Sequence, residues 1–343
     1  MTMVFIDSFD HYTERLDKWD TIQQVQAPLI STTEGRFLNG SLKVGGGSRS
    51  GDLTKFIKVL DQYEYIAGFA VYFPSDCFFD VKFHDVTGAK CGEVTLASPD
   101  MQLGNKDGTT VATAPSSITA ATWQFVEFRC KSHATLGELE VRVDGTIVAS
   151  ATSLNTRGTP ITQIRVEAHP TSDDAYIDDL YVLNTAGLAP HNSFLGDTRI
   201  TVLRPKANGN TNNFTPTGAA SNFQAVDDVL NDGDTTFVEA GQVFAKEDYD
   251  NFNFAELGLS PGTIYGVQVV NAAQKTDAGQ LRYVDQMVVG GVRYTDGSEV
   301  TATTGLYKMT TFISDKDPSD NATWTESKVA AVGSGFEITF REI

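Results

Sequence analysis

Cysteine is scarce in this sequence: Cys77, Cys91 and Cys130 are the only three among 343 residues. An odd and small number of cysteines in so long a chain argues against a disulfide framework. No Cys-x-x-Cys motif is present to complete a metal site. Buried free thiols are therefore expected, with a bridge between Cys77 and Cys91 as the alternative.

Long apolar runs are also absent, because no stretch approaches the roughly 18 residues that a membrane-spanning helix requires. The first residues, MTMVFIDSFDHY, carry acidic side chains where a secretory signal has a basic end and a long apolar centre. The sequence therefore predicts a chain that is made and folded in a cytosol, without membrane insertion.

Positive charge is in short supply. Asp and Glu number 44 against 26 Lys and Arg, which gives a net charge of −18, shared about equally by the two halves of the chain. Binding of nucleic acid through its phosphates would need a basic stripe, so nucleic acid is not an expected partner. Acidity of this degree is compatible with calcium binding, but solubility is its commonest meaning.

Long helical periodicity is missing, and short alternating segments take its place. The clearest is 122–148, TWQFVEFRCKSHATLGELEVRVDGTIV, which predicts three consecutive antiparallel strands. Asp144-Gly145 tolerates the positive φ of a tight hairpin, and pairing across that turn sets Val141 opposite Val148. The first of the three strands is expected to carry a one-residue slip near Val126.

Similar segments predict an N-terminal domain over residues 1–186. Turn signals rich in glycine, proline, asparagine and aspartate separate them, which indicates a sandwich or jelly roll. A connection without periodicity follows at 187–197. Besides the strands of the 122–150 group, strands are predicted at 4–9, 36–44, 65–73, 78–83, 93–96, 161–168 and 175–183.

The remaining residues, 198–343, predict a smaller second β-sandwich. A strand is expected at 198–205 and a polar loop at 207–222. A short helix is expected at 222–230, with Asn222 as its N-cap, and a second at 324–331. Further strands are predicted at 263–272, 281–289, 306–312 and 336–340.

The 122–148 segment resembles part of a known domain group. It begins with a tryptophan and a strand that ends in polar residues, and it continues with a glycine and an apolar strand that closes on Val143-Asp144-Gly145. This order resembles the laminin-G and pentraxin group of concanavalin A-like domains. The closing segment 175–183, AYIDDLYVL, strengthens the resemblance. It implies an all-β fold, with an N-terminal concanavalin A-like (laminin-G-like) jelly-roll sandwich before a smaller C-terminal β-sandwich that has one or two short helices. That group binds carbohydrate or protein and in some branches hydrolyses glycosides, so the fold alone does not determine the function.

Laminin-G and pentraxin domains often bind calcium at the sandwich rim, and the resemblance implies calcium as a candidate cofactor. A hard cation needs several converging oxygens. No continuous EF-hand loop is present, so the ligands would come from separated segments, and turn capping is the alternative role of the carboxylates. The candidate ligands are Asp7, Asp10, Asp173, Asp174, Asp178 and Asp179.

No catalytic residue is predicted. Glycoside hydrolases on this kind of sandwich place paired carboxylates inward on one strand, whereas Glu138 and Glu140 alternate with the apolar residues and are expected to point away from the core. No histidine lies in a recognisable nucleophile motif such as Gly-x-Ser-x-Gly. We therefore expect a protein that is not an enzyme.

Glycan binding would use exposed aromatic side chains as platforms. Most aromatics in strand patterns belong to the core, and Trp123 is expected there. The aromatic side chains considered for a platform are Tyr63, Tyr65, Tyr72, Phe78 and Phe79.

The order of motifs along most of the chain resembles a recurring type of tailed-bacteriophage virion protein. The motifs include the opening Ile6-Asp-Ser-Phe-Asp10, the linker Phe194-Leu-Gly-Asp197 and the closing Asp317-Pro-Ser-Asp-Asn-Ala-Thr-Trp-Thr325. The resemblance implies a non-enzymatic virion structural protein, as a tail fibre, collar appendage or capsid decoration. The expected partners are other virion proteins, further copies of the chain (a trimer if fibre-like) and a host-surface glycan. A calcium-dependent lectin-like protein is the alternative, and a glycoside hydrolase is the third interpretation.

Overall fold

The computed structural model describes residues 3–12, 18–19, 21–22, 30–37, 40–45, 51–56, 62–75, 77–168 and 173–341. The chain forms two compact units, Met1–Thr201 and Val202–Ile343. The division lies later than the expected boundary, and the predicted linker 187–197 falls within the first unit.

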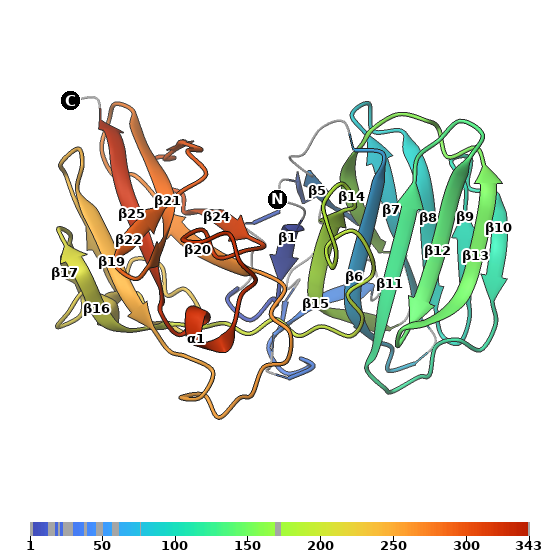
Figure 1. Cartoon of the computed structure of the whole chain (residues 1–343), viewed down its shortest axis with the longest axis horizontal. Helices are drawn as coiled ribbons and strands as arrows, with labels where there is room; N and C mark the ends of the chain where they lie inside the picture. The colour runs from blue at the N-terminus through green and yellow to red at the C-terminus, as the bar shows by residue number, and fades with distance from the viewer. Residues whose placement is uncertain are drawn as a thin grey trace. The chain divides into compact units, whose positions relative to one another are not determined.

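The first unit contains two antiparallel sheets that face each other (Figure 1). In the first of them, sheet A, the strand order is β13-β12-β11-β6-β15-β4-β3. Strand β1 also pairs with β15, along Leu180–Leu183 of that strand. The strands of sheet A are β1 (Met3–Asp7), β3 (Ile30–Ser31), β4 (Ser41–Gly45), β6 (Glu64–Tyr72), β11 (Gln124–Lys131), β12 (Gly137–Val143), β13 (Thr146–Leu154) and β15 (Asp174–Asn184).

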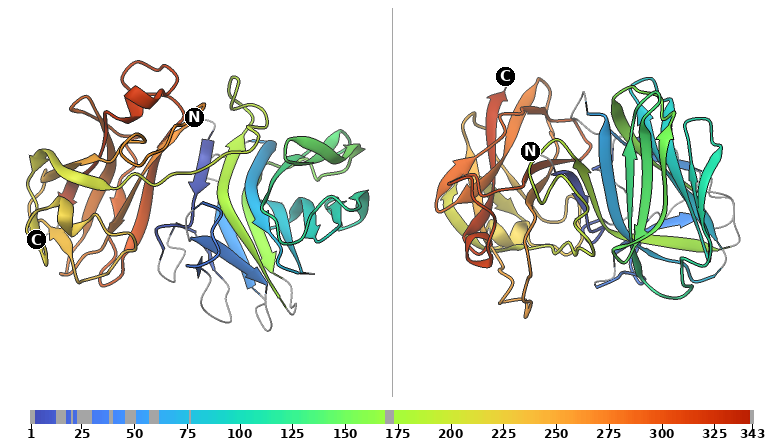
Figure 2. Two further views of the ribbon diagram at one scale, coloured as in Figure 1. Left: turned by 90° about the horizontal axis from the view of Figure 1, so that it is seen from below. Right: turned by 45° about the vertical axis from the view of Figure 1, so that its right-hand side comes forward.

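The second sheet, sheet B, has the order β10-β9-β8-β7-β14-β5-β2. Figure 2 shows the layers of the first unit from two further directions. The strands of sheet B are β2 (Thr21–Ile22), β5 (Gly51–Phe56), β7 (Phe78–Asp85), β8 (Lys90–Ala97), β9 (Met101–Gly104), β10 (Thr110–Ala114) and β14 (Ile161–Ala168). The predicted jelly-roll sandwich is confirmed. It also contains the β9–β10 hairpin, whose strands are not among the predicted ones.

Side-chain alternation places the core between these sheets. Phe128 on β11 meets Phe83 on β7 with ring centroids 5.3 Å apart, so this face of β11 is the inner one. All three cysteines are buried, as expected, and none of them forms a disulfide. We call the face of sheet A that is turned away from sheet B the outer face of sheet A.

The 122–148 prediction is confirmed in outline and wrong in two details of register. Asp144 and Gly145 form the hairpin turn with φ of 48° and 78°. A β-bulge beyond this turn adds a residue to β13, so Val141 lies opposite Ala149 instead of Val148. No slip occurs near Val126, because β11 pairs with both neighbours without a register shift.

The second unit consists of a six-stranded sheet and two strand pairs. The six-stranded sheet C has the order β16-β19-β25-β21-β22, and β23 also pairs with β21. Its strands are β16 (Pro205–Asn212), β19 (Lys246–Asn251), β21 (Leu281–Val289), β22 (Val292–Tyr294), β23 (Val300–Thr301) and β25 (Val332–Arg341). The pairs are β17 (Thr215–Thr217) with β18 (Phe237–Glu239) and β20 (Val267–Ala273) with β24 (Lys308–Ser314).

The core of the second unit lies where the β20–β24 pair packs on sheet C. Trp324 is 4% exposed and donates its indole N–H to the Ser314 carbonyl, 3.0 Å away. The short helix α1 (Glu326–Val329) follows it, as predicted, and Thr325 caps this helix. The buried residues of the cluster are Val269, Met287, Val289, Phe312, Trp324, Val329 and Val332.

Two predictions for the second unit are wrong. The strand expected at 198–205 begins only at Pro205, and β16 and β17 occupy part of the expected polar loop. The expected helix at 222–230 is a single 3-10 turn, η1 (Phe223–Ala225). Asn222 does not cap it through its side chain, because the Asn222 amide instead donates to the Phe214 carbonyl and to Glu247.

The prediction of an all-β chain with one or two short helices is confirmed by these elements. Within the described residues, no helix is both long enough and apolar enough to cross a membrane.

Candidate functional site

Asp7 lies at the end of β1 and is the centre of a buried hydrogen-bond network. Its Oδ2 atom accepts hydrogen bonds from the Tyr12 hydroxyl at 2.6 Å and from the Trp19 indole at 3.1 Å, and its Oδ1 atom accepts one from the Phe9 amide. The Lys18 ammonium lies 3.3 Å from Oδ1, with only 2% of its side chain exposed. Burial raises the pKa of Asp7, but Lys18, His11 and the hydrogen bonds outweigh it and hold the pKa below its usual value.

Asp178 and Asp179 lie at a β-bulge in β15, where Asp179 has a φ of 51°. Asp178 accepts a hydrogen bond from the Arg36 amide at 2.8 Å, and Asp179 accepts one from the Ile200 amide at 2.7 Å. The Nη1 atom of Arg36 donates to Asp179, and its Nη2 atom donates to both carboxylate oxygens of Asp197. The two aspartates therefore join the strand to two segments distant in sequence.

Burial is the main cause that raises the pKa of this pair, to about 8 for Asp178 and about 6 for Asp179. The charge of Asp179 raises the pKa of Asp178 further. The nearby negative charge of Asp10 acts in the same direction on both groups. The backbone donors and Arg36 oppose the rise without cancelling it.

The other three candidate ligands are Asp10, Asp173 and Asp174, and each has a partner of its own. Asp10 accepts a hydrogen bond from the Gly40 amide at 3.1 Å. Asp173 accepts one from the Ser75 hydroxyl, and Asp174 forms an ion pair with Lys43.

A calcium ion at these carboxylates would have to compete with the N–H and ammonium donors that already contact them. Among the residues that the structure describes, no group of three or more His, Cys, Asp or Glu side chains is arranged to hold a metal. Calcium binding stays a prediction.

Glu138 and Glu140 lie on the outer face of sheet A, as predicted. Glu138 contacts Arg129 at 3.0 Å and Lys131 at 2.7 Å, and Glu140 contacts Arg142 at 2.7 Å. The hydrogen bond from Lys131 is the largest cause that lowers the pKa of Glu138. A glycosidase acid needs a raised pKa, so Glu138 does not fit that role.

Residues 194–200 cross part of the same outer face. The Gly196 amide donates to Glu127 at 2.9 Å, and the Leu195 amide donates to the Tyr181 hydroxyl. The Arg142 guanidinium lies 4.0 Å from the centre of the Phe194 ring. These contacts explain why Glu127 is only 1% exposed although it points away from the sandwich core.

Three aromatic side chains form a row at one end of the outer face of sheet A. Tyr72 on β6 lies between Trp123, which directly precedes β11, and Tyr176 on β15. The ring centroids of Tyr72 and Trp123 are 5.5 Å apart, and those of Tyr72 and Tyr176 are 6.1 Å apart. Lys43 on β4 pairs with Tyr176 and extends the row to a fourth adjacent strand. We call Trp123, Tyr72 and Tyr176 the aromatic row.

All three side chains of the aromatic row are partly exposed. The expectation that Trp123 belongs to the core is therefore wrong, because Trp123 is on the side of Phe125, and that side is the outer one. Of the residues considered for a platform, Tyr65 and Phe79 are fully buried, whereas Tyr63 and Phe78 are 47% and 39% exposed. The spacing of Trp123 and Phe125 by two was the sequence signal for a shared face.

No known protein family matches this sequence, and no curated protein matches it either. Solved structures resemble the chain in fold. An endo-β-1,4-glucuronan lyase from the fungus Trichoderma reesei is 14% identical, with a TM-score of 0.39 over 53% of this chain and 96% of the lyase.

Two further solved structures give similar values. The carbohydrate recognition domain of Emp46p is 10% identical, with a TM-score of 0.37 over 53% of this chain and 96% of that domain. The winged bean acidic lectin is 8% identical, with a TM-score of 0.35 over 53% of this chain and 98% of the lectin. No role of a side chain in this chain follows from these likenesses.

Proposed function

We propose that this chain is a non-enzymatic glycan-binding protein and that the aromatic row is its contact surface. The observation that carries the proposal is the partly exposed row of Trp123, Tyr72 and Tyr176 on adjacent strands. Tyrosine and tryptophan combine a flat apolar body with a polar edge, which suits a ligand with both kinds of surface. A sugar ring has an apolar face of C–H groups and a rim of hydroxyls.

The spacing of the row suits more than one sugar ring. Neighbouring strands lie about 4.8 Å apart, so three rings on adjacent strands form an extended platform. The Tyr72 hydroxyl and the Trp123 indole N–H have no hydrogen-bond partner among the described residues and are accessible to sugar hydroxyls. The Lys43–Asp174 ion pair adds polar groups next to Tyr176.

The setting we propose for this activity is the outside of a bacteriophage particle, as a tail fibre, collar appendage or capsid decoration. The order of motifs along the chain supports it. In this setting the first unit contacts a host-surface glycan, while other virion proteins and further copies of the chain hold it on the particle. Mass spectrometry of purified particles is the test, and failure to detect the chain there would overturn the virion assignment.

A glycan array tests the binding activity. The full chain is applied to bacterial surface polysaccharides beside Trp123→Ala and a matched control, Phe78→Ala, which removes an exposed aromatic side chain from sheet B. We expect Trp123→Ala to weaken binding by about fivefold or more, because aromatic contacts of this kind contribute about a kcal/mol each. Phe78→Ala should bind as the unchanged chain does.

A second arm repeats the array with a calcium chelator. Binding that persists with the chelator supports the aromatic row as the main contact. Binding that the chelator abolishes and that Trp123→Ala leaves unchanged supports the calcium-dependent lectin instead. Absence of binding to every polysaccharide, with folded protein, would refute the proposed activity.

A further inference from the structure

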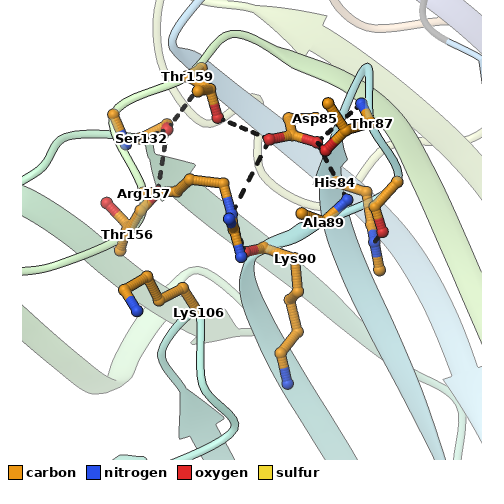
Figure 3. Close-up of polar contacts among 12 residues, drawn as sticks. His84, Asp85, Thr87, Ala89, Lys90, Lys106, Ser132, Thr156, Arg157 and Thr159 are labelled. Atoms are coloured by element: carbon orange, nitrogen blue, oxygen red, sulfur yellow. Dashed lines mark hydrogen bonds and ion pairs between the residues drawn. The ribbon is translucent and has the colours of Figure 1, made fainter.

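Three cationic side chains gather at one rim of the first unit (Figure 3). Arg157 comes from the connection between β13 and β14, Lys90 begins β8, and Lys106 lies in the turn between β9 and β10. A Cβ atom added to Gly108 in that turn would lie 3.2 Å from the Lys90 ammonium, so Lys90 reaches the turn that carries Lys106. This gathering occurs in a chain with a net charge of −18.

Arg157 has a φ of 83°, in the left-handed region that favours glycine. The neighbouring backbone fixes this turn. The Arg157 amide donates to the Asn155 side chain, and the Gly158 amide donates to the buried Ser132 hydroxyl. The hydroxyl of Thr156, which is 0% exposed, donates to the Lys131 carbonyl at 2.6 Å. This backbone conformation is strained for an arginine and unstrained for a glycine. The turn holds the Arg157 side chain at the rim.

The guanidinium of Arg157 is oriented from one side only. Its Nε atom donates to the Lys90 carbonyl at 2.9 Å, and Asp85 lies 3.9 Å away. Neither terminal amino group has a hydrogen-bond or ion-pair partner among the described residues. With 32% of the side chain exposed, these two groups are accessible as a planar fork.

Asp85 approaches the guanidinium on its Nε side, and other donors already engage the oxygens of this carboxylate. The Thr87 amide, the Thr87 hydroxyl and the Ala89 amide donate to Oδ1 at 2.6 to 3.0 Å, and the Thr159 hydroxyl donates to Oδ2 at 2.9 Å. Figure 3 shows Asp85 between Thr159 and the turn that carries Thr87. The aspartate therefore holds the rim together while the guanidinium faces outward.

The two lysines differ in how firmly they are paired. Lys90 contacts Glu93 at 2.7 Å, and both side chains are largely buried. Lys106 contacts the adjacent Asp107, which is 61% exposed, and an exposed pair of this kind contributes little free energy. Lys106 is therefore the cation that is available to move toward a ligand.

We propose that this rim binds an oxyanion, namely a carboxylate, sulfate or phosphate group. The Arg157 fork donates two parallel hydrogen bonds to two of its oxygens, as guanidinium groups do, and Lys106 adds a point charge. The site is separate from the aromatic row and does not depend on it.

Isotope-edited NMR titration of the full chain tests the proposal, with sodium sulfate, sodium phosphate, glucuronate and galactose 6-sulfate as probes and glucose and galactose as neutral controls. We expect saturable shifts of the Gly158 and Ala89 amide signals with the anions and none with the neutral sugars. If only the inorganic ions bind, the ligand is a free anion. If the acidic sugars bind as well, the ligand is a substituent on a saccharide.

Arg157→Gly is the decisive variant because glycine prefers the φ of this position, so the turn is retained while the fork is removed. We expect it to weaken anion binding at least about tenfold, the loss of one charged hydrogen-bonding group. Arg282→Ala, an exposed arginine of the second unit, should bind as the unchanged chain does. Thermal unfolding verifies that both variants are folded. The proposal is overturned if the unchanged chain shows no saturable shift with any anion, or if Arg157→Gly binds with undiminished affinity.

Discussion

Replacement of Asp7 should destabilise the first unit more than the replacement of almost any other single carboxylate. Asp7 is 1% exposed and is the partner of a lysine whose side chain is 2% exposed. Breaking a buried ion pair costs about 3–5 kcal/mol, because the remaining charge stays buried without compensation. Domains are stable by about 5–15 kcal/mol, so Asp7→Ala should remove roughly a fifth or more of that free energy.

The amide variant separates the charge from the hydrogen bonds. Asp7→Asn keeps an oxygen that accepts from Tyr12 and Trp19 but removes the charge beside Lys18, so its loss should be smaller than that of Asp7→Ala. Asp107→Asn is the matched control, since Asp107 is an exposed carboxylate, and it should change stability by about 0.5 kcal/mol at most. Urea unfolding followed by tryptophan fluorescence gives these differences.

The dependence on pH and on calcium tests the same reasoning. Because the pKa of Asp7 is lowered in the folded chain, its contribution is present above the ordinary aspartate pKa, near 4, and is lost as the pH falls below that value. The difference between the unchanged chain and Asp7→Asn should therefore narrow below about pH 4. The structural explanation is refuted if Asp7→Ala loses less than about 1 kcal/mol, or if the loss appears only when calcium is present.

Two further predictions concern other parts of the chain. The pKa of Asp178 is raised to about 8 and that of Asp179 to about 6. Between the ordinary aspartate pKa and these values, the folded chain holds protons that the unfolded chain has released. The contribution of the two aspartates to stability therefore falls as the pH rises from about 4 to about 8. Thermal unfolding between pH 6 and about pH 8.5 should show this fall in the unchanged chain and a flatter profile in Asp178→Asn; equal slopes would contradict it. In the second unit, Trp324→Ala should cost about 3–5 kcal/mol, because it empties the centre of a core and removes the hydrogen bond to Ser314. The exposed Val229→Ala is its control in urea unfolding, and a Trp324→Ala loss no larger than that of the control would contradict the assigned core.

The sequence predicts strands best where one face is buried and the other solvated. β12 shows the alternation of buried and partly exposed residues that the pattern indicates. β21 also has the predicted bounds 281–289, although most of its residues are buried on both faces. β16 lacks such a pattern: its residues are polar, none is buried, and it forms through main-chain pairing with β19. Pairing of this kind leaves no trace in side-chain periodicity, so the sequence pattern predicts a loop for most of this segment.

The candidate site was harder to predict because the outer face of sheet A is partly covered. Phe125 is 1% exposed although it lies on the outer face, where the Arg36 guanidinium and the Tyr181 ring contact it. From the sequence alone Phe125 and Trp123 therefore suggest a core face. Only the three-dimensional packing shows that the cover leaves Trp123 partly exposed.

The roles of Asp178 and Asp179 were hidden for a different reason. A regular strand would point two adjacent aspartates to opposite faces, so the local pattern alone predicts that one of them faces solvent. The β-bulge changes the local geometry, and both side chains become buried hydrogen-bond acceptors. A bulge depends on the pairing of neighbouring strands and is not visible in a local pattern.

The most direct test of glycan binding through the aromatic row uses the three tryptophan indole N–H signals in an NMR titration with the oligosaccharide that binds best on the array. Trp19 and Trp324 donate their indole N–H groups to Asp7 and to Ser314 inside the two units, so they serve as internal controls. We predict that the Trp123 signal shifts and saturates while the other two stay in place. A bound oligosaccharide that leaves the Trp123 signal unmoved would contradict the proposal.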